Sequence, residues 1–138
     1  MELKMKIKLT TYNKIKDFLN GEWNSFFHKK NIERGTDFSY FFEAKEDNEL
    51  IGAAILNVKG GIGLLKDIHI TENHKRKHAG KRLLEIIEEK AKEEGCKKIL
   101  LKTSEIHESA ESFYESEDYK KIATLPNLWY EKDWYFFC

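Results

Sequence analysis

Positive charge gathers in residues 71–85, and the residue types there are typical of an anion-binding site. The start of a helix already carries partial positive charge, so each cation there costs roughly 0.3–1 kcal/mol. The same helix ends in Glu93 and Glu94, at the end where cations are preferred. A phosphate-bearing ligand would satisfy both the N–H groups and the basic side chains at the helix start; the alternative is a solvated basic turn. The basic residues concerned are His74, Lys75, Arg76, Lys77, His78, Lys81 and Arg82.

The composition limits the kind of protein that can carry this stretch. With 138 residues, 41% of them hydrophobic, the chain is long enough for one domain with a sizeable core. The formal net charge is zero, which argues against general nucleic-acid binding because such domains are usually basic. No apolar run approaches the roughly 20 residues of a membrane span, and the start lacks a signal peptide's apolar centre. Cys96 and Cys138 give no disulfide framework and no metal-ligand spacing, which favours a reduced cytoplasmic protein.

The elements that precede the basic stretch are predicted by hydrophobic periodicity. Residues 5–9 alternate polar and apolar side chains and predict a strand. Apolar residues then recur at helical spacing to about residue 30, which predicts two helices divided at Asn20-Gly21. Strands are predicted over residues 37–44, 50–58 and 62–70, joined by turns into an antiparallel meander.

The second half of the chain alternates helices and strands. A helix follows the basic stretch, buries a face that includes Ala79, Leu83 and Leu84, and ends at Gly95. Residues 98–103 predict a buried strand, which should lie parallel to strand 62–70 because a crossover helix separates them. The remaining predicted elements are a helix over about 107–116, with Ala110, Phe113 and Tyr114 inward, and strands over 119–124 and 129–137. This order predicts a mixed α/β sheet covered by helices.

These elements carry short patterns that together resemble the GNAT superfamily of acyl-CoA N-acyltransferases. In its motif A, a strand precedes Gln/Arg-x-x-Gly-x-Gly/Ala and a helix that begins with a Leu-Leu pair. The strand here ends in Ile68-His-Ile70. Counting back from the Leu-Leu pair, Gly80 falls on the second glycine, His78 on the first and Lys75 on Gln/Arg.

Two further patterns lie in register with motif A. Residues 107–119 resemble the family's Asn-x-x-Ala-x-x-x-Tyr-x-x-x-Gly-Phe segment, with His107 for Asn, Asp118 for Gly and Tyr119 for Phe. Tyr114 matches the tyrosine of that segment. The opening of strand 50–58 resembles the hydrophobic-Gly opening of the family's third strand. The resemblance implies a splayed mixed sheet of about six or seven strands, about four flanking helices and a single acetyltransferase-like domain over residues 1–138.

The resemblance also implies acetyl-CoA as the cosubstrate, with no metal. The strand backbone at 68–70 would pair with the pantetheine arm in place of a missing strand, and the pyrophosphate would lie on N–H groups of residues 75–80. The cofactor-binding residues implied are Ile68, His69, Ile70, Lys75, Arg76, Lys77, His78, Ala79, Gly80, Lys81, His107 and Tyr114.

Three departures from the family pattern bear on affinity. His78 places a side chain where glycine lets backbone approach phosphate; cofactor affinity should suffer if its φ is positive, whereas a negative φ is tolerable. A protonated imidazole there would assist phosphate binding. Lys75 loses the bidentate geometry of arginine. Asp118 replaces a turn glycine, but aspartate tolerates left-handed backbone better than most residues.

The chemistry implied is direct attack of an amine on a thioester. Tyr114 is the candidate acid for the departing thiolate, unless it only packs the helix on the sheet. Backbone N–H groups at the strand bulge would polarise the thioester carbonyl. Asp67 and His69 share a strand face, opposite Ile68 and Ile70, and are candidate bases. Glu105 and His107 follow the neighbouring strand, so the base is not assigned among these four.

The sequence does not identify the amine acceptor. Aromatic side chains at either end of the sequence form a candidate acceptor wall, although core packing is the ordinary role of such residues: Trp23, Phe26, Phe27 and Tyr40, and Trp129, Tyr130, Trp134 and Tyr135. The resemblance implies a cytoplasmic acetyl-CoA-dependent N-acetyltransferase that acetylates a primary amine of a small molecule or peptide in a ternary complex.

The alternative is a catalytically inactive GNAT-fold module that binds CoA or a protein partner, which His78 and His107 favour. Nucleic-acid binding through the basic turn is disfavoured by the neutral net charge. The expected partners are acetyl-CoA and an amine acceptor, with no membrane and no nucleic acid. The resemblance also allows a homodimer formed through the last strands, because such dimers are common in the family.

Overall fold

The computed structural model describes residues 5–35, 37–74, 78–107 and 109–138. They divide into two compact units, one up to Gly35 and one from Thr36 onward. In the first unit, residues 5–11 belong to no strand, so the strand predicted over 5–9 is wrong. Alternating side chains become a strand only where the backbone groups pair with a neighbouring strand.

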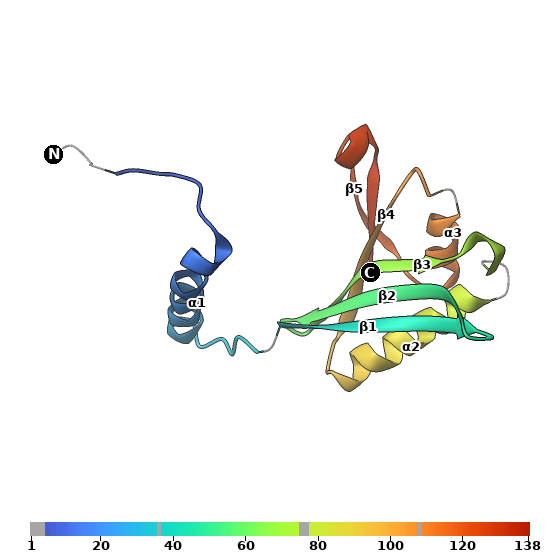
Figure 1. Cartoon of the computed structure of the whole chain (residues 1–138), viewed down its shortest axis with the longest axis horizontal. Coiled ribbons are helices and arrows are strands. Elements are labelled where there is room, and N and C mark those ends of the chain that lie inside the picture. Colours follow the sequence, from blue (N-terminus) through green and yellow to red (C-terminus); the bar gives the residue numbers. More distant parts are fainter. Residues whose placement is uncertain (1–4, 36, 75–77, 108) are drawn as a thin grey trace. The chain divides into compact units, whose positions relative to one another are not determined.

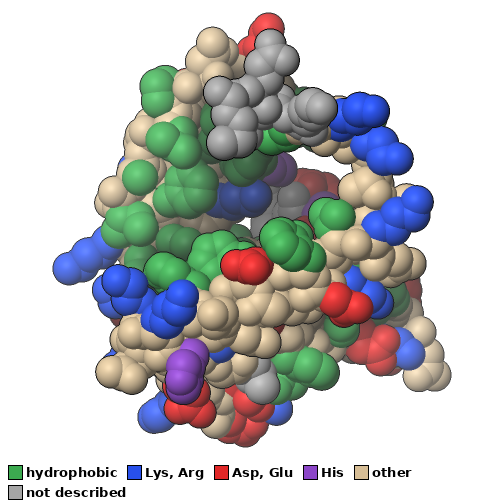
Figure 2. Space-filling view, turned by 90° about the vertical axis from the view of Figure 1, so that its left-hand side faces the viewer, with side chains coloured by type: hydrophobic (Ala, Val, Ile, Leu, Met, Phe, Trp, Pro, Cys, Tyr) green, Lys and Arg blue, Asp and Glu red, His purple; other side chains and the backbone are tan. Residues whose placement is uncertain are grey.

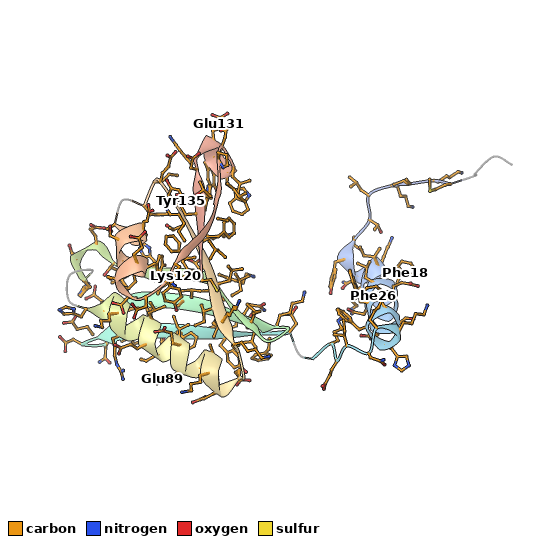
Figure 3. All side chains as sticks on the ribbon, turned by 180° about the vertical axis from the view of Figure 1, so that it is seen from behind. Phe18, Phe26, Glu89, Lys120, Glu131 and Tyr135 are labelled. Carbon is orange, nitrogen blue, oxygen red and sulfur yellow. The ribbon has the colours of Figure 1, made fainter. Side chains whose placement is uncertain are left out.

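The first unit is built on one helix, α1 (Tyr12–Lys29). The division predicted at Asn20-Gly21 is wrong, because a single glycine in a helix costs only about 1 kcal/mol. Aromatic side chains along α1, among them Phe18 and Phe26, are exposed in this unit (Figure 3). Figure 2 shows hydrophobic side chains at the surface beside lysines and arginines. No helix in the described ranges has the length and hydropathy needed to cross a bilayer.

The second unit is a six-stranded mixed sheet with the strand order β1-β2-β3-β4-β6-β5 (Figure 1). Only the β3–β4 pair is parallel among these neighbours, as the crossover helix between them requires. The predicted meander and the predicted parallel pair are therefore confirmed. The strands are β1 (Asp37–Glu46), β2 (Glu49–Lys59), β3 (Ile62–Ile70), β4 (Lys98–Ser104), β5 (Lys121–Leu125) and β6 (Trp134–Phe137).

Two further helices, α2 (Ala79–Glu93) and α3 (Ala110–Ser116), accompany the sheet. The apolar face of α2 packs on the sheet and forms the main core, and Tyr114 of α3 joins the same cluster. Gly95 has a φ of 78° and ends α2 at the left-handed position that glycine favours. The described residues thus hold three α-helices rather than the four expected.

Two boundaries near the C-terminus differ from prediction. Helix α3 begins at Ala110 because residues 105–107 already turn the chain, and Ala110 N–H donates to His107 O at 3.2 Å. The strand predicted over 129–137 is only β6, because a 3₁₀ turn at Trp129–Glu131 precedes it. Tyr130 has a φ of 59° in that turn, a left-handed backbone that no glycine signals in the sequence.

One irregularity in β3 separates it from β4. The β2–β3 register shifts so that Ile55 pairs with Asp67 while Leu56 pairs with Leu65, which leaves Lys66 as an extra residue. Pairing with β4 covers only Ile62 to Leu65, and β3 and β4 diverge beyond that point (Figure 1). Such a bulge bends its strand, so the splay expected from the family resemblance is present.

Candidate functional site

The diverging end of β3 presents one face to the core and one to the surface. Ile70 is buried and Ile68 is half-buried, whereas Asp67 and His69 are exposed. Because the ladder with β4 stops at Leu65, the backbone groups of 66–70 that point toward β4 have no strand partner there. Such an edge can bind an extended, amide-bearing chain by the hydrogen bonds of a strand.

The start of α2 is separated from this strand by residues 71–78 and leaves N–H groups unpaired within the helix. The first intrahelical bond runs from Arg82 N–H to His78 O at 3.0 Å, so the N–H groups of Ala79, Gly80 and Lys81 precede it. No acidic residue occupies the first turn, and no side chain of the described residues caps it. These are the features of a helix start that accepts an anion.

The basic side chains of residues 75–82 differ in their surroundings. Lys75, Arg76 and Lys77 lie outside the described residues. Lys81 is exposed, and Arg82 forms an ion pair with Glu85 at 3.5 Å. Arg82 is therefore already partnered along its own helix.

The opposite end of α2 does not fit the sequence argument. Its last turn contains Lys90 and Lys92, the cations that a helix end prefers. Lys90 forms ion pairs with Glu93 at 3.5 Å and with Glu94 at 3.3 Å. The prediction that both ends of α2 carry unfavourable charge is therefore wrong at the C-terminal end. Only the charges at the start of α2 favour an anion-binding site.

His78 adopts the unfavourable alternative considered for it. Its φ is 61° and its ψ is 12°, in the left-handed region. Asp118 has a φ of 69°, the conformation that aspartate tolerates. The positive φ is the case for which weaker cofactor binding was predicted, and this prediction concerns affinity, which the backbone geometry alone does not measure.

Gly80 connects the helix start to α3. A Cβ at Gly80 would lie 3.5 Å from Cζ of Phe113 and 4.0 Å from Cγ1 of Ile70. The ring of Phe113 lies 5.3 Å from that of Tyr114, measured between centroids. The first turn of α2, the end of β3 and the candidate acid therefore meet in one region.

Tyr114 is only 6% exposed, with its ring packed on Phe137. Burial and, second, the negative charge of Asp67 raise the pKa of Tyr114 to about 12. No hydrogen bond to its hydroxyl is present in the described parts of the chain. No fully buried side-chain oxygen or nitrogen there lacks a hydrogen-bond partner, so the Tyr114 oxygen must be accessible to solvent. A protonated hydroxyl in this position can donate to a developing thiolate.

The candidate bases are now distinguishable by their surroundings. Asp67 and His69 are exposed on the face opposite the core, and Asp67 is close enough to influence Tyr114. Glu105 is used in closing the β4–β6 pair: its carboxylate accepts from Asp133 N–H at 3.4 Å, and its own N–H donates to Asp133 O at 3.1 Å. His107 is exposed in the turn before α3.

The aromatic residues considered for the acceptor wall fall into separate groups. Trp129 and Trp134 form an edge-to-face pair at 5.1 Å, with Lys102 Nζ 4.2 Å from the centre of the Trp129 ring. Tyr40 lies below Lys90 of α2, so it belongs to the core side of the sheet. The remaining members are Trp23, Phe26 and Phe27 of α1, and Tyr130 and Tyr135 of the second unit.

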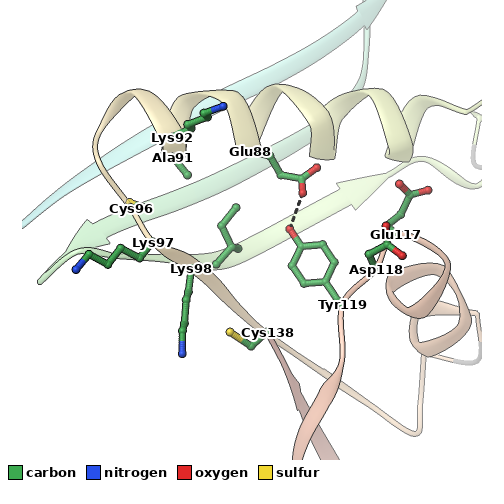
Figure 4. A pocket seen from close by; sticks show the side chains of 11 residues that line it. Glu88, Ala91, Lys92, Cys96, Lys97, Lys98, Glu117, Asp118, Tyr119 and Cys138 are labelled. Atoms are coloured by element: carbon green, nitrogen blue, oxygen red, sulfur yellow. Dashed lines mark hydrogen bonds between the residues drawn. The ribbon is translucent and has the colours of Figure 1, made fainter.

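Sequence reasoning missed two polar contacts. Tyr119 Oη donates to Glu88 Oε2 at 3.2 Å, at the edge of an open cavity of about 500 Å³ that both cysteines also line (Figure 4). Burial raises the pKa of Glu88 and of Tyr119. The second contact joins His74 to Thr71 and Glu46. The sequence shows that His74 lies among basic residues, but it does not show the contact with Glu46, which is distant in the chain.

Comparisons with known proteins agree with this architecture. The family model described as Acetyltransferase (GNAT) family matches residues 9–118. No curated protein matches the sequence. An acetyltransferase from Bacillus cereus ATCC 14579 superposes with a TM-score of 0.79 at 18% identity, covering 96% of this chain and 95% of that one.

Two other solved structures are also similar. The ribosomal-protein-S18-alanine N-acetyltransferase from Escherichia coli has a TM-score of 0.66 at 19% identity, with 82% of this chain and 73% of that one covered. A provisionally assigned streptothricin acetyltransferase from Bacillus anthracis str. Ames, solved in complex with acetyl coenzyme A, has a TM-score of 0.64 at 22% identity, covering 79% and 65%. At these identities the likeness concerns the fold.

The family match and the fold lead to the same assignment. The matched residues include the splayed end of β3, the start of α2 and Tyr114. The six-stranded mixed sheet is the architecture of the acetyltransferase structures it resembles. The chain therefore belongs to the acetyltransferase (GNAT) family.

Proposed function

We propose that this protein is an acetyl-CoA-dependent N-acetyltransferase that acetylates a primary amine of a small molecule or peptide by direct attack in a ternary complex. The observation that carries the proposal is the divergence of β3 from β4 after Leu65, followed along the chain by a helix start without an acidic residue. An open strand edge and an anion-accepting helix start, in that order, suit a ligand with an amide-bearing arm and a pyrophosphate.

The residues present fit this ligand. The edge formed by Ile68, His69 and Ile70 would hold the pantetheine arm, and the N–H groups of Ala79 to Lys81 would hold the pyrophosphate. Acetyl-CoA supplies the activated acetyl group as a thioester. Lys75, Arg76, Lys77 and His107 remain proposed contacts from the family resemblance.

Tyr114 is the proposed acid. Its raised pKa, about 12, keeps the hydroxyl protonated at neutral pH, so it can donate to the thiolate as the C–S bond breaks. Asp67 and His69, exposed on the surface face of β3, are the proposed acceptors, directly or through water, of the proton that the substrate ammonium loses so that the neutral amine can attack. Asp67 also suits binding of the cationic amine before it loses its proton.

The second candidate function is a catalytically inactive module that binds CoA or a protein partner. The left-handed His78, with a φ of 61°, favours it because a Cβ and an imidazole stand where the family has glycine. The two candidates differ in turnover, so a broad panel of primary amines separates them once acetyl-CoA binding is established.

Calorimetry of acetyl-CoA and CoA binding tests the proposal first. Lys81→Glu is the most informative variant because its two effects have opposite signs. A carboxylate in the first turn of α2 should stabilise the helix by about 0.3–1 kcal/mol and yet repel the pyrophosphate. We expect a higher Tm together with clearly weaker acetyl-CoA binding.

Gly80→Trp serves as a blocked-site control, because a side chain there lies beside Phe113 and Ile70. Micromolar binding to the unmodified protein that both variants weaken would support the cofactor site. Absence of acetyl-CoA binding in the unmodified, folded protein would contradict the proposed function and leave the protein-binding module.

We also propose that the protein has a single domain, that it is cytoplasmic and that it can form a homodimer. The family match runs from residue 9 to residue 118 across the division at residue 35, which supports a single acetyltransferase-like domain over 1–138. Cys96 and Cys138 are free thiols, which suits the cytoplasm. A homodimer remains a proposal that sedimentation of the purified protein tests.

A further inference from the structure

A chain of three polar side chains joins the hairpin of β1 and β2 to the segment that leads into α2. His74 Nδ1 lies 2.7 Å from Thr71 Oγ1, and His74 Nε2 lies 3.3 Å from Glu46 Oε2. The His74 side chain is 15% exposed, whereas that of Glu46 is 45% exposed. The ring is therefore largely enclosed and held at both nitrogens.

The backbone fixes the same segment beside the hairpin. Thr71 N–H donates to Ile51 O of β2 at 2.8 Å, and His74 N–H donates to Thr71 O at 2.9 Å. Glu46 is the last residue of β1, directly before the turn at Asp47 and Asn48. The end of β3 and the start of β2 lie at the same end of the sheet, as the pairing of Gly52 with Ile70 requires (Figure 1).

The chemistry of the three groups fixes the orientation of the imidazole. The Glu46 carboxylate carries no proton to offer, so its contact with His74 Nε2 favours the form of the ring that has its proton on that nitrogen. In the neutral ring, Nδ1 then accepts from the Thr71 hydroxyl, and in the charged ring Nδ1 donates to it. In either state His74 bridges a residue of β1 and the residue that follows β3.

We propose that His74 is a positioning residue for acetyl-CoA. By tying residues 71–74 to Glu46, it fixes where the chain leaves the β3 edge and where it approaches the first turn of α2. Both proposed contacts of the ligand, the strand edge and the helix N–H groups, are thereby held at a set separation before the ligand arrives. This inference rests on the proposed function.

Preorganisation of this kind matters here because the turn itself carries a strained residue. His78 is left-handed without being glycine, a conformation that costs roughly 1–2 kcal/mol. A turn with such a residue keeps its shape only when the surrounding structure holds it. The brace through Glu46 supplies a hold from outside the turn, and binding sites so preorganised lose less affinity to ordering.

The test compares His74→Ala, Glu46→Ala and the double variant with the unmodified protein. We expect each single variant to raise the Kd and the KM for acetyl-CoA about tenfold, with kcat within about twofold. The double variant should be no weaker than the worse single variant, because both substitutions break the same His74–Glu46 contact. His74→Gln, which keeps an N–H donor for Glu46, should recover part of the affinity.

Matched controls separate positioning from simple loss of stability. His28→Ala removes an exposed histidine from the last turn of α1 and should leave the acetyl-CoA Kd unchanged. A lower Tm for His74→Ala with an unchanged acetyl-CoA Kd would overturn the positioning role while leaving the proposed function intact. Additive effects of the two single variants would also overturn it. Failure of the unmodified protein to bind acetyl-CoA would overturn both proposals.

Discussion

At the scale of single residues, Tyr114 combines a buried ring with a reachable hydroxyl. Its ring contacts Phe137 and Tyr119, at centroid distances of 5.9 and 6.1 Å. Packing and proton donation therefore rest on different parts of one side chain. Removing only the oxygen separates the two roles.

Tyr114→Phe is accordingly expected to preserve the fold and to impair catalysis. General acid catalysis contributes about 10²–10⁴-fold, so kcat should fall within that range while the acetyl-CoA Kd changes less than about twofold. Steady-state kinetics and calorimetry on the same preparation measure both quantities. An unchanged kcat would show that Tyr114 only packs α3 on the sheet.

The raised pKa of Tyr114 also has a consequence for stability. Its pKa moves from 10.0 to about 12 in the folded protein, so the folded state holds the proton longer than the unfolded state. The contribution is fully present below pH 10.0 and is lost as pH rises through about 12, a decline of about 2–3 kcal/mol. Urea unfolding at several alkaline pH values should show this decline, and Tyr114→Phe should reduce it. Equal slopes for both proteins would contradict it.

His78→Gly tests whether the departure from glycine weakens the cofactor turn. The residue has a φ of 61°, and glycine adopts that backbone without the Cβ clash. We expect a several-fold lower acetyl-CoA Kd and a gain of up to about 1 kcal/mol in unfolding free energy. Calorimetry and urea titration measure these. Weaker binding by the glycine variant would instead assign the imidazole a direct role at the phosphates.

At the scale of elements, the close approach of β2 to β3 is made possible by Gly52. A Cβ there would stand 2.4 Å from Ile70 Cδ1 and 3.0 Å from His69 O. One of these contacts is with the backbone of the proposed pantetheine edge. The small residue therefore fixes where the end of β3 lies.

Gly52→Ala should accordingly displace the end of β3. We expect a loss of about 1–3 kcal/mol in unfolding free energy, as for other overpacked sites, and weaker acetyl-CoA binding. Gly21→Ala in α1 is the matched control, because nothing lies within 4 Å of its Cβ position. It should stabilise the protein by about 0.5–1 kcal/mol. Similar effects of the two substitutions in urea titrations would contradict the argument.

The elements that sequence reasoning predicted well are those formed by neighbours in the chain. The meander of β1, β2 and β3 follows from alternation and short turns, and α2 from its apolar face and Gly95. The predicted strand at residues 5–9 was wrong because alternation does not show whether a strand has a partner. The predicted start of the last strand was wrong because Tyr130, which is not glycine, adopts left-handed backbone.

The positions of the candidate site residues in the fold were predictable to a similar degree. Motif spacing placed the helix start and Tyr114, because both are local to their elements. The contact between His74 and Glu46 was not predictable, since it depends on the register between β2 and β3. The choice between Asp67 and His69 as base depends on the acceptor's position, which no spacing in this chain encodes.

At the scale of the whole molecule, the proposed anion site lies on a protein of zero formal net charge. Its attraction for a phosphate-bearing ligand is therefore local and acts over about 10 Å at 0.1 M salt. The charge of the rest of the surface does not add a long-range attraction for polyanions.

We expect acetyl-CoA binding to weaken several-fold when salt is raised from about 0.05 M to about 0.5 M. Duplex DNA should show no saturable binding at about 0.15 M salt, because a neutral protein lacks the many phosphate contacts that such binding needs. Calorimetry for acetyl-CoA and fluorescence anisotropy for DNA measure both. Tight, steeply salt-dependent DNA binding would revive the nucleic-acid hypothesis.

The extra residue at Lys66 means that the ligand edge depends on a single codon. With Lys66 opposite no residue of β2, Leu65 still faces the core, as do Ile68 and Ile70 after it. Deleting that codon would therefore keep every core side chain on its face while removing the bend. The strand would then be free to continue along β4 and close the edge by itself. A gene could lose this one codon and encode a sheet as well packed as before, but without a place for the ligand.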